Sequence, residues 1–326
     1  MLDLSLDRLF FEKFQVTLQA ESNTYLPFFA APSLRGALGW GLKDVSCTLK
    51  HQKCQNCILK NNCAYSVLFE TPLPENASVL KFQKNIPHPV VIETELRKKN
   101  TVKKGEALLF NIIVAGKALK YIPYLISAID RMAKNGMGRD KKPFTLMSVK
   151  RFTFNIEQPF ETVWNKDNTD SIKTSKSHTV ADVITSSTPH NRVTVQFLTP
   201  VKITSQGTTE FPVTFRSFAR SLFSRLSAML EFYSGITLNA DVSEFIKMAA
   251  TVKTVNDMQK KDRLNRWSSR QKRSVHLYGA SGEVTWQGDA VKELWQLLQF
   301  GEIFHAGKST IMGMGRYRLI SSANPL

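Results

Sequence analysis

The order of predicted strands and helices is the feature that most restricts the fold of this chain. In the first half, alternating apolar residues predict strands at "FQVTLQ" and "FTLMSVKRFTF", and an apolar run predicts another at Ala107–Gly116. Periodic segments predict helices at "APSLRGALGWGLKDVSC" and "KALKYIPYLISAIDRMAKNGMG", and "YSVLFET" and "VVIETEL" between them are strand-like. This order approximates βαββαβ, the ferredoxin-like unit.

The second half repeats the same order without a visible sequence repeat. "RVTVQFLTPVKI" predicts a strand, "FPVTFRSFARSLFSRLSAMLEFY" a helix, "RSVHLYGASGEVTWQG" two strands turning at the glycines, "DAVKELWQLLQF" a helix with Asp289 as N-cap, and "RYRLI" a last strand. The fold class is therefore α+β, with two tandem ferredoxin-like (RRM-like) domains. We place them at residues 1–158 and 191–326, separated by a polar linker or irregular excursion at 159–190.

Net charge restricts the partners. The chain carries 44 Lys and Arg against 27 Asp and Glu, which gives +17 at pH 7. Such a field attracts polyanions, with nucleic acid as the leading candidate and a merely basic protein as the alternative. No apolar run approaches the ~18 residues that span a bilayer, and the first residues lack a basic region ahead of an apolar stretch. We therefore expect a cytoplasmic protein without membrane contact.

Four cysteines lie close together in the first half. Their spacing in "CTLKHQKCQNCILKNNC" is C-x6-C-x2-C-x5-C, which places a small loop at residues 47–63. A tight cluster in a reducing compartment indicates metal rather than disulfides. Four thiolates complete a tetrahedral zinc site and leave no open position, so the site would be structural. An iron–sulfur cluster and unligated or disulfide-linked cysteines are the alternatives. The predicted ligands are Cys47, Cys54, Cys57 and Cys63.

A glycine-rich loop lies before the last predicted strand, at residues 301–315. "GEIFHAGKST" is similar to a nucleotide-binding loop, but five residues separate its two glycines where that motif has four. An amphipathic helix also precedes it, where a nucleotide fold has a buried strand. We therefore expect no nucleotide-binding fold. Glycine at 307, 313 and 315 lets backbone N–H groups approach a phosphate of another kind.

Five segments together resemble a known family. They are "LRGALGWGLK" with the four-cysteine loop and "YSVLFE", "HPVVIE" (His88–Glu93), "RWSSRQ" (Arg266–Gln271), and Gly301 followed by "HAGKSTIMGMGRY". With two ferredoxin-like halves and a basic charge, the chain resembles the CRISPR precursor-RNA processing endoribonucleases of the RAMP superfamily. The match is to the subset with an N-terminal four-cysteine loop and a C-terminal HxGK…GxG loop.

The resemblance implies an endoribonuclease of CRISPR antiviral defence. Such an enzyme cuts precursor RNA within repeats and releases guide RNAs, without a catalytic metal. The 2′-hydroxyl beside the scissile phosphate attacks it, giving a 2′,3′-cyclic phosphate and a 5′-hydroxyl, so DNA would survive. Expected partners are precursor and processed repeat RNA, and other CRISPR effector subunits. The alternative is a non-catalytic RAMP subunit that binds repeat or guide RNA in an effector complex.

This chemistry needs a base, an acid and positive charge near the phosphate. His305 is the first candidate for acid or base, with Lys308 stabilising the phosphorane; alternatively His305 only shapes the loop by hydrogen bonding. His51 is the rival, because family members commonly place a catalytic histidine near the first helix, often with a tyrosine nearby. Here His51 falls inside the cysteine loop, which leaves open a role as loop residue or metal ligand. Tyr25 is its candidate partner.

A basic segment at Gln259–Arg273 is the predicted RNA-binding surface, because cations with an interleaved tryptophan suit phosphate contact and base stacking. The alternative is a solvated charged face. Helix positions one turn apart in "RSFAR" add two cations, and the first helix and the glycine loop add more. The predicted RNA-binding residues are Arg35, Arg216, Arg220, Arg263, Arg266, Trp267, Arg270, Lys272, Arg273, Gly307, Gly313, Gly315 and Arg316.

Overall fold

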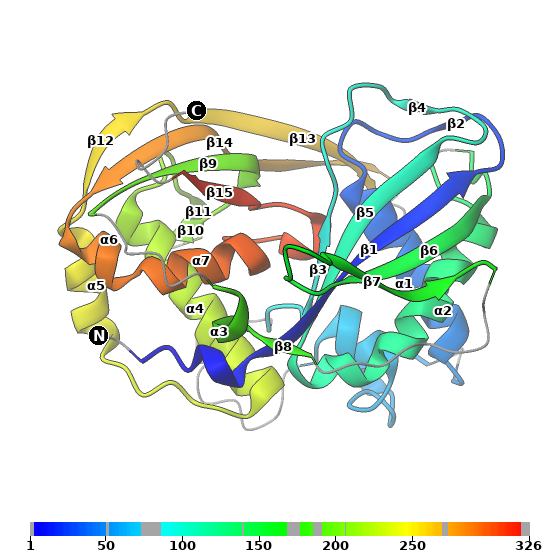
Figure 1. The fold of residues 1–326 in the computed structure, drawn as a ribbon, viewed down its shortest axis with the longest axis horizontal. Coiled ribbons are helices and arrows are strands. Elements are labelled where there is room, and N and C mark those ends of the chain that lie inside the picture. The colour runs from blue at the N-terminus through cyan, green and yellow to red at the C-terminus, as the bar shows by residue number, and fades with distance from the viewer. Residues whose placement is uncertain are drawn as a thin grey trace. The chain divides into compact units, whose positions relative to one another are not determined.

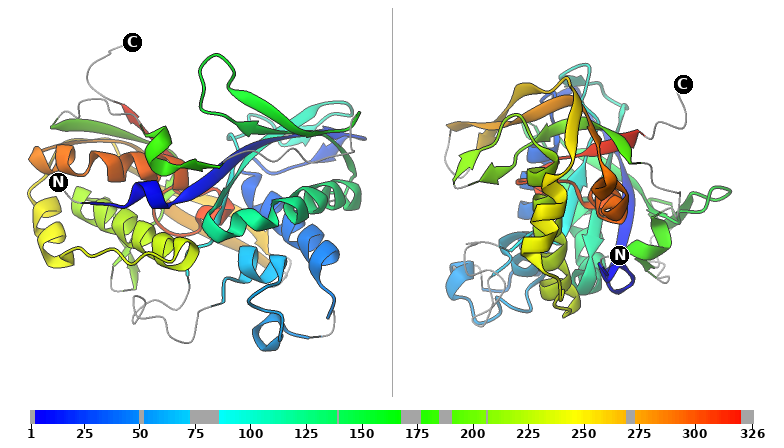
Figure 2. Two further views of the ribbon diagram at one scale, coloured as in Figure 1. Left: turned by 60° about the horizontal axis from the view of Figure 1, so that its bottom comes forward. Right: turned by 90° about the vertical axis from the view of Figure 1, so that its left-hand side faces the viewer.

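Two antiparallel sheets, each with helices packed on one face, form two units (Figures 1 and 2). The computed structural model describes residues 3–49, 52–72, 86–138, 140–167, 177–184, 191–205, 207–268 and 273–320. The N-terminal unit is Phe10–His178. The C-terminal unit contains the described residues from Thr179 onward together with those before Phe10, which the sequence assigned to the N-terminal domain. No helix among the described residues is long and apolar enough to cross a bilayer.

The N-terminal sheet has the predicted ferredoxin-like strand order. Its strands run β3-β5-β1-β6-β7. Phe14, Val16 and Leu18 on β1 are almost fully buried, as their alternation predicts. The last strand, β7, lies inside the segment predicted as a linker. The bounds are β1 Phe10–Ala20, β3 Val90–Glu93, β5 Ala107–Ala115, β6 Phe144–Phe152 and β7 Phe160–Asn165.

Helices α1 (Ala31–Ser46) and α2 (Ile122–Asn135) pack against each other and cover this sheet. Pro123 is tolerated because it lies in the first turn of α2, after the 3-10 turn η4 (Gly116–Tyr121). The strand predicted at "YSVLFET" is wrong: Ser66–Glu70 form a π-helix, η3. Four successive residues from Ser66 to Phe69 are buried, and a short apolar run does not by itself distinguish a strand from a buried helical turn.

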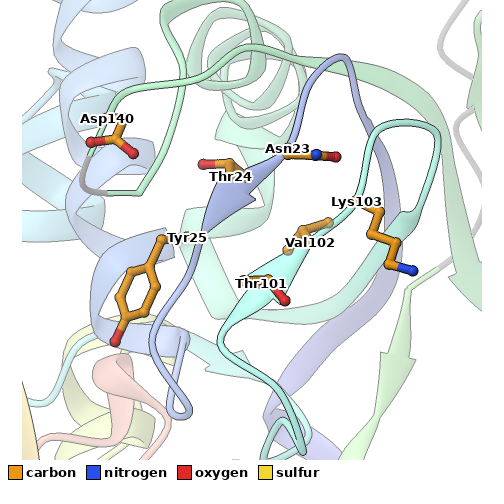
Figure 3. A pocket seen from close by; sticks show the side chains of 7 residues that line it. All are labelled: Asn23, Thr24, Tyr25, Thr101, Val102, Lys103 and Asp140. Carbon is orange, nitrogen blue, oxygen red and sulfur yellow. The ribbon is translucent and has the colours of Figure 1, made fainter.

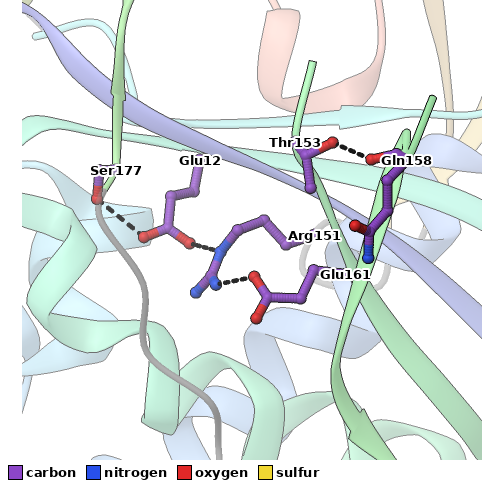
Figure 4. Close-up of polar contacts among 6 residues, drawn as sticks. All are labelled: Glu12, Arg151, Thr153, Gln158, Glu161 and Ser177. Carbon is purple, nitrogen blue, oxygen red and sulfur yellow. Dashed lines mark hydrogen bonds and ion pairs between the residues drawn. The ribbon is translucent and has the colours of Figure 1, made fainter. Parts of the chain in front are cut away.

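A buried arginine ties three strands of the N-terminal sheet together (Figure 4). Arg151 on β6 is 3% exposed. Its Nε donates to Glu12 Oε2 on β1 at 2.7 Å, and its Nη1 donates to Glu161 Oε2 on β7 at 3.1 Å. Ser177 Oγ donates to the second oxygen of Glu12 at 2.9 Å. These contacts make β7 an integral strand of the unit.

The C-terminal sheet also has the ferredoxin-like order, β12-β14-β9-β15, with β13 paired to β14. The predicted pair of strands at "RSVHLYGASGEVTWQG" is wrong, because β14 is one strand with a register shift between Ala280 and Gly282. This shift is a bulge that glycine tolerates, where the sequence suggested a turn. The bounds are β9 Arg192–Val201, β12 Lys253–Asp257, β13 Lys260–Ser268, β14 Arg273–Gln287 and β15 Tyr317–Ile320.

Helices α4 and α7 pack together in this unit, and α5, absent from the sequence prediction, packs on α4. The helix predicted at "DAVKELWQLLQF" is divided into α6 and α7 at Leu294, and Gly288 rather than Asp289 is its N-cap. The bounds are α4 Phe215–Ser234, α5 Val242–Ala250, α6 Asp289–Glu293 and α7 Trp295–Phe304. The short elements are η1 Leu6–Arg8, β2 Thr24–Tyr25, η2 Cys54–Asn56, β4 Thr101–Val102, β8 His178–Thr179, α3 Val180–Val183, β10 Thr204–Ser205, β11 Thr208–Thr209 and η5 Thr310–Met312.

Candidate functional site

Strands β13 and β14 form a ribbon that extends beyond the rest of the C-terminal sheet (Figure 1). Strand β9 pairs with β14 only between Ala280 and Gln287. Arg273–Gly279 therefore pairs with β13 alone. The basic segment singled out in the sequence is one strand of this ribbon, together with the connection to the next.

One face of the ribbon is exposed, basic and aromatic. Arg263 lies opposite Tyr278, and Asn265 lies opposite His276, so these four side chains share a face. Tyr278 is 47% exposed, and its ring lies 5.9 Å from that of His276. His276 Nδ1 lies 2.6 Å from Asn265 Oδ1. Lys261, on the same face, lies over the Phe211 ring at 5.1 Å. This face presents cations, rings and hydrogen-bonding groups to solvent.

The other face of the ribbon is apolar. Leu264 and Leu277, opposite each other, are buried at 8% exposure. Arg266 lies on this face, and burial lowers the pKa of its guanidinium. It therefore does not share a face with Arg263, because alternate residues of a strand point to opposite sides. Register, which the sequence does not show, separates the two arginines.

The other predicted RNA-binding residues are placed as follows. Arg273 is exposed opposite Ser268, and Arg216 is exposed in the first turn of α4, whereas Arg220 is half-buried one turn later. Arg35 belongs to α1 of the N-terminal unit, with its guanidinium carbon 5.2 Å from the Phe69 ring centroid. The Trp267 side chain, Arg270 and Lys272 lie outside the described residues.

Backbone N–H groups of the glycine-rich loop form hydrogen bonds to strand β9 and within the loop itself. Gly315 N donates to Pro200 O at 3.0 Å, and Gly313 N donates to Thr310 O at 2.8 Å. These two N–H groups are therefore not available to a phosphate, contrary to the expectation from sequence. Gly307 and Gly315 have φ of 76°, and a Cβ at either position would collide with a backbone carbonyl. The glycines serve close packing of the loop.

His305 lies inside this loop. Its side chain has no exposed surface, its backbone has φ of 63°, and its Nδ1 lies 3.0 Å from Met314 O. This geometry matches the alternative in which the histidine shapes the loop. Lys308 is exposed, whereas its own N–H donates to Lys202 O at 2.9 Å. Arg316 is half-buried, and its N–H donates to Thr199 Oγ1 at 2.9 Å.

Tyr25 lies on a small ribbon in the N-terminal unit, where β2 pairs with β4. Its side chain is 43% exposed and lines a pocket of about 350 Å³ (Figure 3). The other lining residues are Asn23, Thr24, Thr101, Val102, Lys103 and Asp140. His51, its predicted partner, lies outside the described residues.

The four cysteines lie at and beyond the end of α1, are half-buried and are not joined by disulfides. Cys47 is the C-cap of α1, and Cys54 begins η2. Burial raises the pKa of the Cys54 thiol, and the nearby Glu70 carboxylate adds to the rise. Ser46 Oγ lies 4.0 Å from Cys63 Sγ. Among the described residues, no group of three metal-binding side chains is gathered at one point.

Sequence reasoning missed two groups of exposed residues. Tyr278 and Asn265 join the basic face only through strand pairing, so no local signal pointed to them. The cations of "RKKNTVKK", at residues 97–104, are visible as a charge run and lie beside Tyr25 only in the folded chain.

Comparisons with known proteins agree with these observations. Residues 195–317 match the family model of the CRISPR-associated endoribonuclease Cas6. Residues 9–177 match a family described as an N-terminal domain (AF_1859_N). A search of curated proteins gives no match.

Solved structures of Cas6 proteins share the fold over nearly the whole chain. Thermus thermophilus Cas6 has a TM-score of 0.56 at 14% identity, covering 96% of this chain and 99% of that one. Its product complex has a TM-score of 0.59 at 15% identity, covering 95% and 99%. A chain of a Cas6-RT-Cas1–Cas2 complex has a TM-score of 0.53 at 12% identity, covering 98% of this chain and 30% of that one. The match of residues 195–317 and the two ferredoxin-like units lead to one conclusion: the C-terminal part of the chain is a CRISPR-associated endoribonuclease Cas6 domain, and the chain as a whole has the fold of Cas6 proteins.

Proposed function

We propose that this protein cleaves CRISPR precursor RNA within its repeats and so generates guide RNAs. The match of residues 195–317 to the Cas6 endoribonuclease family carries this proposal. The exposed face of the β13–β14 ribbon supports it, because cations bind phosphates and exposed rings stack on bases. A net charge of +17 adds long-range attraction for the RNA.

The proposed reaction uses the RNA's own 2′-hydroxyl and no metal. A base removes the proton of that hydroxyl, its oxygen bonds to phosphorus, and the bond from phosphorus to the 5′-oxygen breaks. An acid protonates the leaving oxygen, which leaves a 2′,3′-cyclic phosphate and a 5′-hydroxyl. We assign the acid–base role to His51. Lys308 is exposed, and its side chain can contact a phosphate of the RNA. His305 is buried and would need its loop to open first.

The decisive test is incubation of the purified protein with its cognate repeat RNA in excess EDTA. We expect cleavage at one position, with a 5′-hydroxyl product that polynucleotide kinase labels without phosphatase treatment. A matched RNA with a single 2′-deoxy substitution at the cut should bind with similar affinity and remain intact. Tight binding with intact all-ribose RNA would contradict the enzyme and favour the alternative, a subunit that binds repeat or guide RNA within an effector complex.

We further propose that the four cysteines hold a structural zinc ion in a reducing, cytoplasmic setting. Elemental analysis of protein purified without chelator should find about one zinc per chain. Cys54→Ser/Cys57→Ser should lose it and melt at lower temperature, because zinc binding contributes to folding. Ser46→Ala is the control and should retain the metal. Iron with visible absorbance would favour a cluster, and no metal in the folded protein would contradict both.

The partners follow from the same proposal. One structural relative is a chain of a Cas6-RT-Cas1–Cas2 complex, and another is described with its product. We infer that this chain binds precursor and processed repeat RNA and joins other CRISPR proteins in its cell.

A further inference from the structure

We propose that the outer face of the β2–β4 ribbon, in the N-terminal unit, binds single-stranded RNA next to the repeat that is cut. In this proposal Tyr25 stacks on a base and nearby lysines contact phosphates. The inference rests on the proposed function for the identity of the RNA. Its geometry is independent of the β13–β14 ribbon, which belongs to the other unit.

Strand pairing determines which side chains share the outer face. Thr24 pairs with Val102, and Tyr25 pairs with Thr101. Val102 is 0% exposed and Thr24 is 5% exposed, so this pair points inward. Because successive side chains of a strand alternate, Tyr25 and Thr101 point to the other side. Figure 3 shows Lys103 on the opposite side of the pocket from Tyr25 and Asp140.

The ribbon is held in place before any ligand binds. Leu26 N donates to Asn100 O at 2.8 Å, and Arg97 N donates to Phe28 O at 3.0 Å. Arg97 Nη2 also donates to Thr101 O at 3.2 Å, and Lys104 N donates to Asn23 Oδ1 at 2.9 Å. These contacts fix the backbone on both sides of Tyr25. A preorganised platform loses little conformational entropy when it binds.

Charge on this face favours a polyanion. Residues 97–104 carry five cations and no carboxylate. Among the ion pairs of the described residues, none involves these lysines. The Glu106 carboxylate accepts from Lys103 N at 2.9 Å, and it leaves the segment with a clear excess of positive charge. The lysines, all exposed, are Lys98, Lys99, Lys103 and Lys104.

Two exposed aromatic rings favour single-stranded RNA as the polyanion that binds here. Tyr25 is 43% exposed and Phe28 is 47% exposed. Burying either ring against an unpaired base gains apolar contact, whereas the bases of a duplex are already stacked on each other. An acidic protein surface would pair with the lysines but would offer no base to stack on the two rings.

The pocket beside Tyr25 suits a base edge rather than a phosphate. Asp140 lines it, and a carboxylate repels phosphate but accepts hydrogen bonds from base amino groups. The pocket would therefore hold a base that carries N–H donors, while phosphates lie along the lysines.

The first test measures stacking with a fluorescein-labelled 12-nucleotide single-stranded RNA of mixed sequence and the full-length protein. Tyr25→Ala should weaken binding by about 5- to 100-fold, the effect of losing one base-stacking ring. Tyr25→Phe should bind within about twofold of wild type, since it keeps the ring. Tyr124→Ala, an exposed ring elsewhere in the same unit, is the matched control. Tyr25→Phe as weak as Tyr25→Ala, or Tyr25→Ala equal to wild type, overturns the stacking role.

The second test measures charge and location. Lys98→Ala/Lys103→Ala should reduce the slope of log affinity against log salt by about 1.4, because each single-strand phosphate contact contributes about 0.7. Lys120→Ala/Lys134→Ala changes the charge equally at other exposed positions and should not alter the slope. Ultraviolet cross-linking with peptide mass spectrometry should place the RNA on the peptide containing Tyr25 or Phe28. Cross-links confined to residues 259–273 would overturn the proposal.

These measurements separate the inference from the proposed enzyme. The 12-nucleotide RNA contains no repeat, so its binding is read without cleavage. If the wild-type protein binds the 12-nucleotide RNA through Tyr25 but does not cleave repeat RNA, the proposed enzymatic activity is refuted and the proposed binding surface is supported. If the wild-type protein cleaves repeat RNA but Tyr25→Ala binds the 12-nucleotide RNA as tightly as wild type, the proposed activity is supported and the proposed binding surface is refuted.

Discussion

Replacing His51 with alanine is expected to slow cleavage of cognate repeat RNA by about 10²- to 10⁴-fold under single-turnover conditions. The reason is that transesterification needs a group that exchanges a proton at the scissile phosphate, and imidazole does so near neutral pH. Binding of the RNA should change little, because phosphate contacts dominate affinity. Imidazole added to the buffer should restore part of the rate, which a purely structural histidine would not show.

His305→Asn is the matched control for His51→Ala. Asparagine keeps an N–H donor for Met314 O, and the backbone at this position, with φ of 63° and ψ of 163°, is strained for asparagine as it is for histidine. We expect a lower melting temperature with a cleavage rate within about tenfold of wild type, since loss of a general acid or base costs more than that. Wild-type cleavage by His51→Ala would refute its assignment. Slow cleavage by a well-folded His305→Asn would return the catalytic role to His305.

Replacing Arg151 with methionine is expected to lower the free energy of unfolding of the N-terminal unit by about 3–5 kcal/mol. Methionine leaves the Glu12 carboxylate, which is 4% exposed, without its partner. The desolvation cost of that charge is then no longer offset by the guanidinium. Urea unfolding followed by circular dichroism measures the loss. Adding Glu12→Gln should recover part of it, because an amide is cheaper to bury than a carboxylate.

Lys134→Ala provides the comparison for Arg151→Met. Lys134 Nζ and Asp130 Oδ2 are also 2.7 Å apart, but the lysine side chain is 67% exposed. Water and ions screen that pair, so we expect a loss of only about 0.3–0.5 kcal/mol. If both variants lost the same free energy of unfolding, burial would not be the reason that Arg151 stabilises the protein.

Much of the fold follows from local patterns. The alternation of Phe14, Val16 and Leu18 matches β1, and the element order in each half matches the ferredoxin-like sheet that forms. Local pattern was insufficient where packing competes with it. Ser66–Phe69 pack on α1 as a π-helix, and Gly282 accommodates a bulge rather than a turn. Short apolar runs and isolated glycines are each compatible with more than one structure.

The candidate site divides in the same way. The sequence alone determined that the chain is strongly basic and that cations cluster at Gln259–Arg273, because composition and charge runs need no tertiary information. Only the tertiary structure decided which of them share a face. Pairing places Arg263 beside Tyr278 and turns Arg266 to the apolar side.

Tertiary structure also decided the fate of the glycine loop. The loop's position before the final strand follows from sequence, but the hydrogen bonds from Gly315 to Pro200 and from His305 to Met314 do not. The first bond needs strand β9, which lies more than a hundred residues earlier in the chain. The second needs Met314 to fold back onto His305. Residue types are local, whereas burial and pairing are set by contacts between distant parts of the chain.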